Sequence, residues 1–516
     1  MTPAVPRLFA IDDALPSGGT TLIQASAGTG KTYALAALTV RYVAERDLPI
    51  SKILLVTFTR AATAELRDRI RKRLVEAADH IAGLIAGADG GSVDDPLLEV
   101  IGRGTPAELD ERHDRLRRAI RDFDTATIST IHGFCSQVRS SMGVLSPDNI
   151  DAVPAESEGE LISQVCADLL FRQLDAAAEN PLGGRDLAGF IKLVRTARTL
   201  SDSIIQAESG KEEDQRAADL VAVAIAEIDD RLARTGGLSY DSLLSSVRQA
   251  LLTDPDLAGQ LRSLYDVALI DEFQDTDSVQ WDIFRTVFGD GNHGSTLILV
   301  GDPKQAIYSF RGGDVYTYLE AKKQATVVAL GTNQRSDEAA VAAMNALGEG
   351  HVFGEPEIDY QVVEPAERHR GRRLLEAGGA PAPGLVVRCL VDPEAAGVDK
   401  LASDPARRRI AVDLADVAAD LIVDGVVEAP GKDPVPVTAG MIAVLVGATR
   451  DAPPIAEALR RRGIPAVLRL KDNVANSEAG EAHSQWRTLL WALERPANTQ
   501  RATAAALTWF FGWPPE

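Results

Sequence analysis

The sequence predicts an α/β protein built on a parallel sheet, with a helical block inserted into it and a second α/β unit after it. Short apolar runs alternate with helical stretches over residues 20–75, similar runs return at 267–270 and 296–300, and a long stretch of helical period separates the two sets. Strands that alternate with helices pair in parallel. The 516 residues, 45% hydrophobic and 25% charged, suit a globular protein with more than one core.

Composition limits the class of partner and the compartment. Lys and Arg number 54 against 75 Asp and Glu, a net charge of −21. This excludes a generic basic coat for nucleic acid but allows a local basic groove, because charges farther apart than a Debye length of ~10 Å are screened. Cys135, Cys166 and Cys389 are too widely spaced to predict disulfides or a zinc site. No apolar run predicts a membrane span, so we expect a cytoplasmic protein with no membrane partner.

The first expected strand, at residues 21–23, leads into a segment of small residues and then into a helix near Tyr33. Glycines in such a turn let backbone N–H groups approach phosphate oxygens, the lysine after them reaches the β- and γ-phosphates, and a threonine hydroxyl ligates Mg²⁺. A plain glycine-rich turn is the alternative, and Ala25 stands where the general motif has glycine, but the Lys-Thr pair favours nucleotide binding. The predicted nucleoside triphosphate site consists of Ala25, Ser26, Ala27, Gly28, Thr29, Gly30, Lys31 and Thr32, with Thr32 as a Mg²⁺ ligand.

The next expected elements are a buried strand over residues 52–57 and a helix over 61–75. From Gly83 to about Asp110 the chain is rich in Gly, Asp and Pro, which predicts an exposed loop. Residues 155–260 are mostly helical by period. Because strand patterns continue after this block, we expect it to be an accessory domain inserted into the sheet domain.

A second unit is expected after Gly331. Apolar runs at residues 385–390 and 441–446 predict buried strands, and the periodicity predicts helices over 406–423 and 452–462. The pattern at the end of the chain is that of an unfinished domain. The expected organisation is a first sheet domain over 1–150 and 265–335, a helical insertion over 151–264 and a partial second sheet domain over 336–516.

Acidic residues follow the apolar run Val267–Ile270 directly. In the sequence Asp-Glu-Phe-Gln-Asp, Asp271 is expected to hold Mg²⁺ through water and Glu272 to polarise an attacking water. A solvated acidic cluster at a strand end is the alternative. The phosphate-binding segment upstream in the same chain favours the catalytic interpretation.

The run Val300–Gly312 combines an amide with aromatic and cationic side chains. Gln305 lies just past a strand end, where it can sense a γ-phosphate. Tyr308, Phe310 and Arg311 are of the types that stack on unpaired bases, at about 1–3 kcal/mol per base. For the two rings, at positions i and i+2, a place in the core is the stronger alternative.

The order of these motifs resembles the superfamily-1A helicases of the UvrD/Rep group. The chain also has Val-Thr-Phe-Thr-Arg-Ala-Ala at 56–62, Thr-Ile-His-Gly-Phe-Cys at 130–135 and Gly-Thr-Asn-Gln-Arg-Ser at 331–336. The sequences of these motifs are most similar to those of the RecB family, the helicase–nuclease subunits of exonuclease V. The resemblance is specific over 20–340 and weaker beyond. It implies a P-loop NTPase fold with a RecA-like core, a helical accessory insertion and an incomplete second RecA-like domain.

The resemblance also implies residue roles at an ATP site and along DNA. Arg335 matches the arginine that reaches the γ-phosphate, which contributes about 10³–10⁵ in rate. For His132 a core histidine is the alternative to a DNA contact. The implied ATP site is Lys31, Thr32, Asp271, Glu272, Gln305 and Arg335; the implied DNA-binding residues are Phe58, Tyr308 and Phe310 as base-stacking rings, Arg311 beside them, and Thr57, Thr59, Arg60 and His132 near the backbone.

By resemblance, the function is that of an ATP-dependent 3′→5′ DNA helicase acting in recombinational repair of double-strand breaks. The implied ligands are ATP, Mg²⁺ and single-stranded DNA or tailed duplex ends, with RecC- and RecD-like partner subunits. A P-loop kinase or metabolic ATPase does not explain the aromatic segment after Gln305.

Three departures from the family pattern keep a second hypothesis open. Gln334 replaces the aromatic residue that covers adenine, and Gly447 replaces a basic residue common after a strand of the second domain. The later motifs, including a second phosphate-sensing arginine, and a nuclease domain are not found in the sequence. The alternative function is therefore a truncated non-motor that binds nucleotide or single-stranded DNA, or docks a partner, without unwinding.

Overall fold

The computed structural model divides the chain into two compact units, Met1–Arg370 and Gly371–Glu516, which are described separately. None of the described helices combines the length and apolar character needed to cross a bilayer. The described residues are 6–87, 95–142, 153–154, 158–176, 186–198, 212–234, 237–238, 240–289, 294–307, 313–390, 403–468, 478–494 and 499–511.

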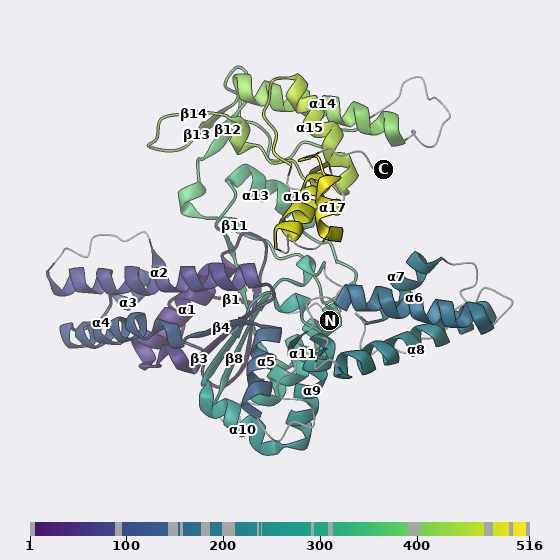
Figure 1. Cartoon of the computed structure of the whole chain (residues 1–516). Helices are drawn as coiled ribbons and strands as arrows, with labels where there is room; N and C mark the ends of the chain where they lie inside the picture. Colours follow the sequence, from purple (N-terminus) through teal and green to yellow (C-terminus); the bar gives the residue numbers. More distant parts are fainter. Residues whose placement is uncertain are drawn as a thin grey trace. The chain divides into compact units, whose positions relative to one another are not determined.

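The first unit is built on a seven-stranded sheet in the order β1-β9-β2-β8-β7-β3-β4, in which every pair of neighbours is parallel (Figure 1). This confirms the predicted α/β class. The strands are β1 Arg7–Leu8, β2 Gly19–Ala25, β3 Ile53–Thr57, β4 Thr127–Thr130, β7 Val267–Ile270, β8 Thr296–Gly301 and β9 Thr326–Leu330.

Both faces of the sheet are covered, which explains why its strands have continuous apolar sequences. In β3, Ile53 and Leu55 contribute to one core, while Leu54 and Val56 contribute to the core on the opposite face. One face packs against α1 Lys31–Arg46, α2 Arg60–Ile85, α3 Pro96–Ile101 and α4 Pro106–Arg121; the other packs against α5 Ile131–Met142, α9 Tyr240–Thr253, α10 Pro255–Leu264, α11 Ser278–Phe284 and α12 Val315–Gln324.

The exposed loop predicted from Gly83 to Asp110 is wrong for most of the described part of this stretch; residues 88–94 lie outside the described residues. Helix α2 continues to Ile85, and α3 and the start of α4 lie in the same stretch; α2 and α4 run side by side (Figure 1). The turn-forming residues are helix caps. Asp95 caps α3 with Pro96 at its first position, and Thr105 forms a capping box with Glu108 at the start of α4.

Helices α6 Glu158–Ala176, α7 Leu187–Arg198 and α8 Glu212–Arg234 enclose a small core of their own that includes Val165, Phe190 and Ile228. A short parallel bridge pairs β5 Val153–Pro154 with β6 Gly237–Leu238 at the two ends of this block. Helices α9 and α10, also within the predicted helical stretch, instead pack on the sheet. The helical periodicity of the sequence thus corresponds to helices that serve two separate cores.

The remaining part of the first unit carries the chain back toward the glycine turn between β2 and α1, where the Gln334 N–H donates to the Gly28 carbonyl. Strand β10 Thr332–Asn333 pairs in parallel with β11 Glu364–Pro365, and α13 Glu338–Gly348 lies between them in sequence. These elements follow β9, so residues 331–336 leave the sheet at its carboxyl edge.

In the second unit, α14 Ser403–Asp424 packs against α15 Ala452–Arg461 through small residues such as Ala411 and Ala415. The described strands there are short and antiparallel. They are β12 Arg373–Leu375, β13 Val426–Glu428 and β14 Val435–Pro436; α16 Glu478–Glu494 and α17 Thr499–Ala506 follow.

The buried strands predicted at 385–390 and 441–446 are wrong. Neither run pairs with a strand among the described residues. Ile442 and Val444 contact the α14–α15 pair on alternate positions, while Leu445 is 96% exposed. An apolar run supplies one buried face, but a strand also needs a neighbour for its backbone N–H and C=O groups.

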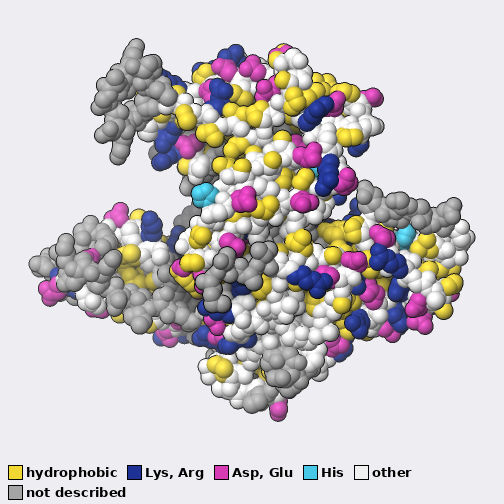
Figure 2. Space-filling view, turned by 180° about the vertical axis from the view of Figure 1, so that it is seen from behind, with side chains coloured by type: hydrophobic (Ala, Val, Ile, Leu, Met, Phe, Trp, Pro, Cys, Tyr) yellow, Lys and Arg dark blue, Asp and Glu magenta, His cyan; other side chains and the backbone are white. Residues whose placement is uncertain are grey.

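Acidic and basic side chains are interspersed on the face shown in Figure 2. Oppositely charged residues also pair one helical turn apart, as Arg69 does with Glu65 on α2 and Arg115 with Glu111 on α4. Such exposed pairs contribute about 0.3–0.5 kcal/mol each, so they affect solubility more than the stability of the fold.

Helix α3 lies in the stretch that the sequence predicted to be a loop, and its packing can be tested by substitution. Leu97 is fully buried against the α1–α2–α4 core, so Leu97→Ala should lower the free energy of unfolding by about 2–5 kcal/mol. Urea denaturation would measure this. The control Asp110→Ala, on the exposed side of α4, should change stability by less than about 0.5 kcal/mol. Equal effects of the two substitutions would contradict the packing of α3.

Candidate active site

The turn between β2 and α1 forms the floor of the candidate site. Ala25 is the last, buried residue of β2, and α1 starts at Lys31. Gly28 and Gly30 have φ values of +80° and +93°, which favour glycine. No side chain caps the N-terminus of α1. Its first N–H groups and the positive end of its dipole therefore remain available to an anion.

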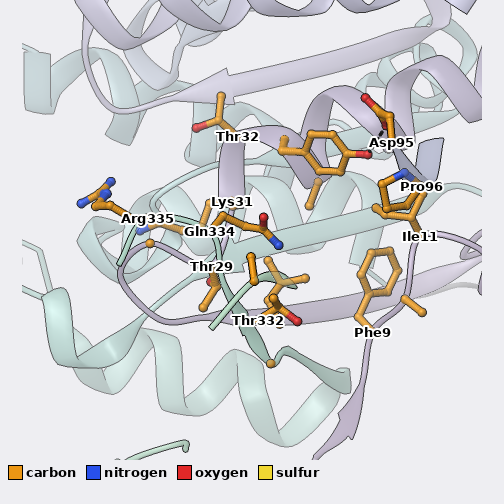
Figure 3. A pocket seen from close by; sticks show the side chains of 18 of the residues that line it. Phe9, Ile11, Thr29, Lys31, Thr32, Asp95, Pro96, Thr332, Gln334 and Arg335 are labelled. Carbon is orange, nitrogen blue, oxygen red and sulfur yellow. Dashed lines mark hydrogen bonds between the residues drawn. The ribbon is translucent and has the colours of Figure 1, made fainter. Parts of the chain in front are cut away.

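A cavity of about 1130 Å³ opens over this turn. Figure 3 shows Thr29, Lys31 and Thr32 of the turn together with Gln334 and Arg335, which come from the segment after β10. Of the predicted site residues, those on the cavity wall are Ala27, Gly28, Thr29, Gly30, Lys31, Thr32, Glu272, Gln305 and Arg335. Ala25, Ser26 and Asp271 are not on the wall: the first two lie in the backbone leading to it, and Asp271 lies beside Glu272.

The acidic pair follows β7 at the same edge of the sheet. The Asp271 backbone N–H donates to the Val56 carbonyl (2.8 Å), and Glu272 has φ 50° and ψ 43°, a left-handed conformation that is uncommon for a side-chain-bearing residue. In this conformation Glu272 Oε2 lies 2.7 Å from Lys31 Nζ. Burial, followed by the Glu272 charge, raises the pKa of Asp271 to about 6.

The ion pair is part of a closed ring of hydrogen bonds that joins five residues. Gln274 Nε2 donates to Glu272 Oε2 (2.7 Å), and the Asp302 backbone N–H donates to Gln274 Oε1 (3.0 Å). Gln305 Nε2 donates to Asp302 Oδ2 (2.7 Å), and Lys31 Nζ approaches Gln305 Oε1 at 3.4 Å. Lys31 and Glu272 are thus bonded to each other, so a phosphate that binds Lys31 competes with Glu272.

Gln274 and Asp302 are site residues that the sequence reasoning missed. Both are buried, and both lie inside motifs already noted, Asp-Glu-Phe-Gln-Asp and Gly-Asp-Pro-Lys-Gln. The sequence did contain a signal for them, because Gln274 lies two residues after Glu272 and Asp302 lies three residues before Gln305. Asp302 also pairs with Lys304 (2.8 Å), which adds a positive charge behind the ring.

The residues of the turn fit a nucleoside triphosphate with Mg²⁺. The Ser26 hydroxyl is buried and has no hydrogen-bond partner among the described residues, so a polar group of the turn is left unsatisfied. Lys31 and the free N–H groups of α1 supply positive charge for phosphates. The Thr32 hydroxyl and the Asp271 carboxylate are oxygen donors of the kind that Mg²⁺ takes.

The residues predicted to lie along DNA are in different environments. Thr57 is buried, and its hydroxyl bonds to Thr63 Oγ1 (2.8 Å), so it supports the loop after β3 internally. Thr59 caps α2 by accepting from the Ala62 N–H (3.1 Å). Thr59 and Arg60 are exposed, and Phe58 between them and β3 is half-buried.

His132, at the start of α5, is half-buried, and this burial lowers its pKa below the ordinary value. A neutral imidazole would not attract phosphate by charge, which agrees with the alternative that it belongs to the core. Tyr308, Phe310 and Arg311 lie outside the described residues.

A further carboxylate in this region gives a pH-dependent prediction. Asp275 is 6% exposed, and its Oδ1 has no hydrogen-bond partner among the described residues. Burial, with a further contribution from the Glu272 charge, raises the pKa of Asp275 to about 6. Since its pKa in the unfolded chain is about 3.9, the folded protein binds this proton more tightly, and the free energy of unfolding falls as pH rises from about 4 to about 6.

Asp275→Asn should therefore be more stable than the wild type by about 1–3 kcal/mol near pH 7.5, and no more stable near pH 4. Urea denaturation of the nucleotide-free, metal-free protein at both pH values would measure the difference. The exposed control Asp110→Asn should show no such pH dependence. A gain that is equal at the two pH values would contradict an ionised buried carboxylate at Asp275.

Comparison with known proteins agrees with this geometry. Residues 11–326 match the family model of the UvrD/REP helicase N-terminal domain. The chain is 35% identical over 504 residues to "RecBCD enzyme subunit RecB" of Mycobacterium tuberculosis, covering 96% of this chain and 44% of that protein. The same subunit of Mycolicibacterium smegmatis is 36% identical over 514 residues (98% and 45%), and that of Escherichia coli is 28% identical over 625 residues (94% and 50%).

The chain thus spans about half the length of the curated relatives it matches. The matched region includes the turn after β2, the acidic pair after β7 and Gln305. This chain belongs to the UvrD/REP helicase family and is similar to RecB subunits.

Proposed function

We propose that this chain is an ATP-dependent DNA helicase motor of the RecB type. The observation that carries the proposal is the meeting of Lys31, Glu272 and Arg335 on the wall of one cavity above a glycine turn and an uncapped helix N-terminus. Three separate regions of the chain contribute these groups. Each has the chemistry that phosphoryl transfer requires: a cation for the phosphates, a carboxylate for the attacking water and a second cation for the charge of the transition state.

In the proposed reaction, Lys31 exchanges its bond with Glu272 for the β- and γ-phosphates of ATP. The released Glu272 carboxylate orients and polarises the attacking water, and Gln305 senses the γ-phosphate. Thr32 and Asp271 would hold Mg²⁺, which neutralises charge on the phosphate oxygens. Arg335 stabilises the charge that develops on the γ-phosphoryl group.

The proposal extends to the domains. Residues 1–150 and 265–335 would form the first motor domain, 151–264 the accessory insertion and 336–516 part of a second motor domain. The fully buried strands that end at Ile270 and Gly301 support the first assignment, because ligands of parallel sheets bind beyond the carboxyl ends of strands.

The finer assignments follow from the similarity to RecB subunits. They are translocation from 3′ to 5′ along single-stranded DNA, action at double-strand breaks, association with RecC- and RecD-like subunits, and a cytoplasmic location. Thr59 and Arg60 are exposed at the end of β3, where the proposed DNA contact would lie, and Phe58 beside them is half-buried. A translocation assay with streptavidin displaced from one or the other end of an oligonucleotide would test the polarity.

The central test is ATP hydrolysis with and without single-stranded DNA. Wild type should hydrolyse ATP and be stimulated by the DNA. Lys31→Ala should reduce turnover by at least about a hundredfold, because it removes the cation for the phosphates. Lys323→Ala, on the exposed surface of α12, is the control and should behave as wild type.

Circular dichroism would show whether Lys31→Ala remains folded. If the wild-type protein binds nucleotide or DNA but does not hydrolyse ATP, the result would support the alternative function, a binding protein without motor activity.

Glu272→Gln should separate binding from chemistry. The amide keeps the size of the side chain but cannot polarise water, so turnover should fall strongly. Affinity for a fluorescent ATP analogue should stay equal or increase, because Lys31 loses the ion pair that competes with phosphate. Hydrolysis at the wild-type rate would remove Glu272 from the catalytic role.

A further inference from the structure

We propose that Asn333 is a positioning residue that holds Arg335 against the phosphate-binding turn, so that the arginine and the turn bind the nucleotide as one rigid unit. The inference rests on the proposed ATPase site and adds a residue to it. Asn333 itself is not on the cavity wall, so its effect is transmitted through Arg335 and the turn.

The Asn333 side-chain amide forms hydrogen bonds through both its nitrogen and its oxygen. The side chain is 3% exposed. Its Nδ2 donates to the Ala27 carbonyl (3.3 Å), and its Oδ1 accepts from the backbone N–H groups of Arg335 (2.9 Å) and Ser336 (2.8 Å). One side chain therefore joins the phosphate-binding turn to the backbone that carries the arginine.

A second contact strengthens this junction. The Gln334 backbone N–H donates to the Gly28 carbonyl (2.7 Å). A Cβ atom at Gly28 would lie 3.0 Å from Asn333 Nδ2 and 3.2 Å from the Arg335 Cβ. The two backbones thus approach so closely that the turn needs glycine here for lack of space as well as for its positive φ.

The other side of the segment is also held. The Ala366 N–H donates to the Asn333 carbonyl (2.9 Å), and Arg368 Nη2 donates to the Gln334 carbonyl (3.0 Å). The backbone of Arg335 is fixed from both sides, the residue lies on the cavity wall, and its guanidinium has no hydrogen-bond partner among the described residues, as expected for a group kept for a ligand.

The chemistry of the junction requires an amide. Aspartate at position 333 would keep the oxygen that accepts from Arg335 and Ser336, but it would lose the donor to Ala27 and place a carboxylate against that carbonyl. Asn333→Asp should therefore preserve the turn after β10 and break the link to the phosphate-binding turn. The substitution separates positioning from folding.

The experiment is a double-mutant cycle with Asn333→Asp and Arg335→Ala, read both from kcat with single-stranded DNA and from affinity for a fluorescent ATP analogue with Mg²⁺. Asn333→Asp should lower both by about tenfold, because a buried acceptor loses its donor. Its circular dichroism spectrum without nucleotide should match that of wild type, although the buried carboxylate should lower the melting temperature. In the Arg335→Ala background the same substitution should cost about threefold or less, because its main target is already absent. Gln334→Glu, which adds a charge to the cavity wall without contacting the Ala27 carbonyl through its side chain, controls for simple repulsion of phosphate.

An Asn333→Asp variant that binds and turns over ATP as wild type does would overturn the inference, as would equal losses in the two backgrounds or a loss no larger than that of Gln334→Glu. Absence of turnover in the wild type contradicts the proposed function instead. The cycle read from nucleotide affinity still decides the role of Asn333 in that case.

Discussion

The parallel pairing of the central strands is the constraint on which the site depends. Gln24 pairs with Gly301 across β2 and β8, and Val56 pairs with Ile270 across β3 and β7. Because the strands run in one direction and in register, the residues that follow them emerge at a single edge. Lys31, Glu272 and Gln305 come from positions up to 274 residues apart in the sequence, yet this register places them on the wall of one cavity. Burial on both faces fixes the register, since a slip by one residue would exchange the two cores.

The polar groups at this edge are bonded to one another. Lys31 and Glu272 form an ion pair whose side chains are 13% and 35% exposed, and the amides of Gln274 and Gln305 complete the network. A bound triphosphate can replace Glu272 as the partner of Lys31, because it offers the lysine more negative charge than one carboxylate does. The left-handed backbone of Glu272 belongs to the same arrangement, since strained backbone conformations occur where the surrounding contacts determine them.

In the first unit, contacts on two sides hold the turn that we propose to bind nucleotide. The turn after β2 is bound from one side by the start of α1 and from the other by residues 333–334. Among the described residues, the Ser26 hydroxyl and the Arg335 guanidinium have no hydrogen-bond partner, whereas the backbone groups that join the turn to residues 333–334 are paired. The second unit contrasts with the first. There the apolar runs at 385–390 and 441–446 have no strand neighbours among the described residues, and only alternate side chains such as Ile442 and Val444 reach a core.

The sequence by itself determined the elements whose signal is local. Apolar runs of four to six residues identified β7 and β8, and the glycine turn with Lys31 and Thr32 identified the start of α1. It also identified Glu272, Gln305 and Arg335 as candidates, because motif order carries that information. Local composition gave wrong predictions in two cases. Helix caps such as Asp95 and Thr105 resembled loop residues, and two apolar runs predicted strands for which the described residues offer no partner strand. The tertiary structure alone decided the strand order, the ring through Gln274 and Asp302, and the junction at Asn333. These depend on contacts between residues distant in the chain, and a side chain's partner across such a distance is set by packing rather than by its own sequence neighbours.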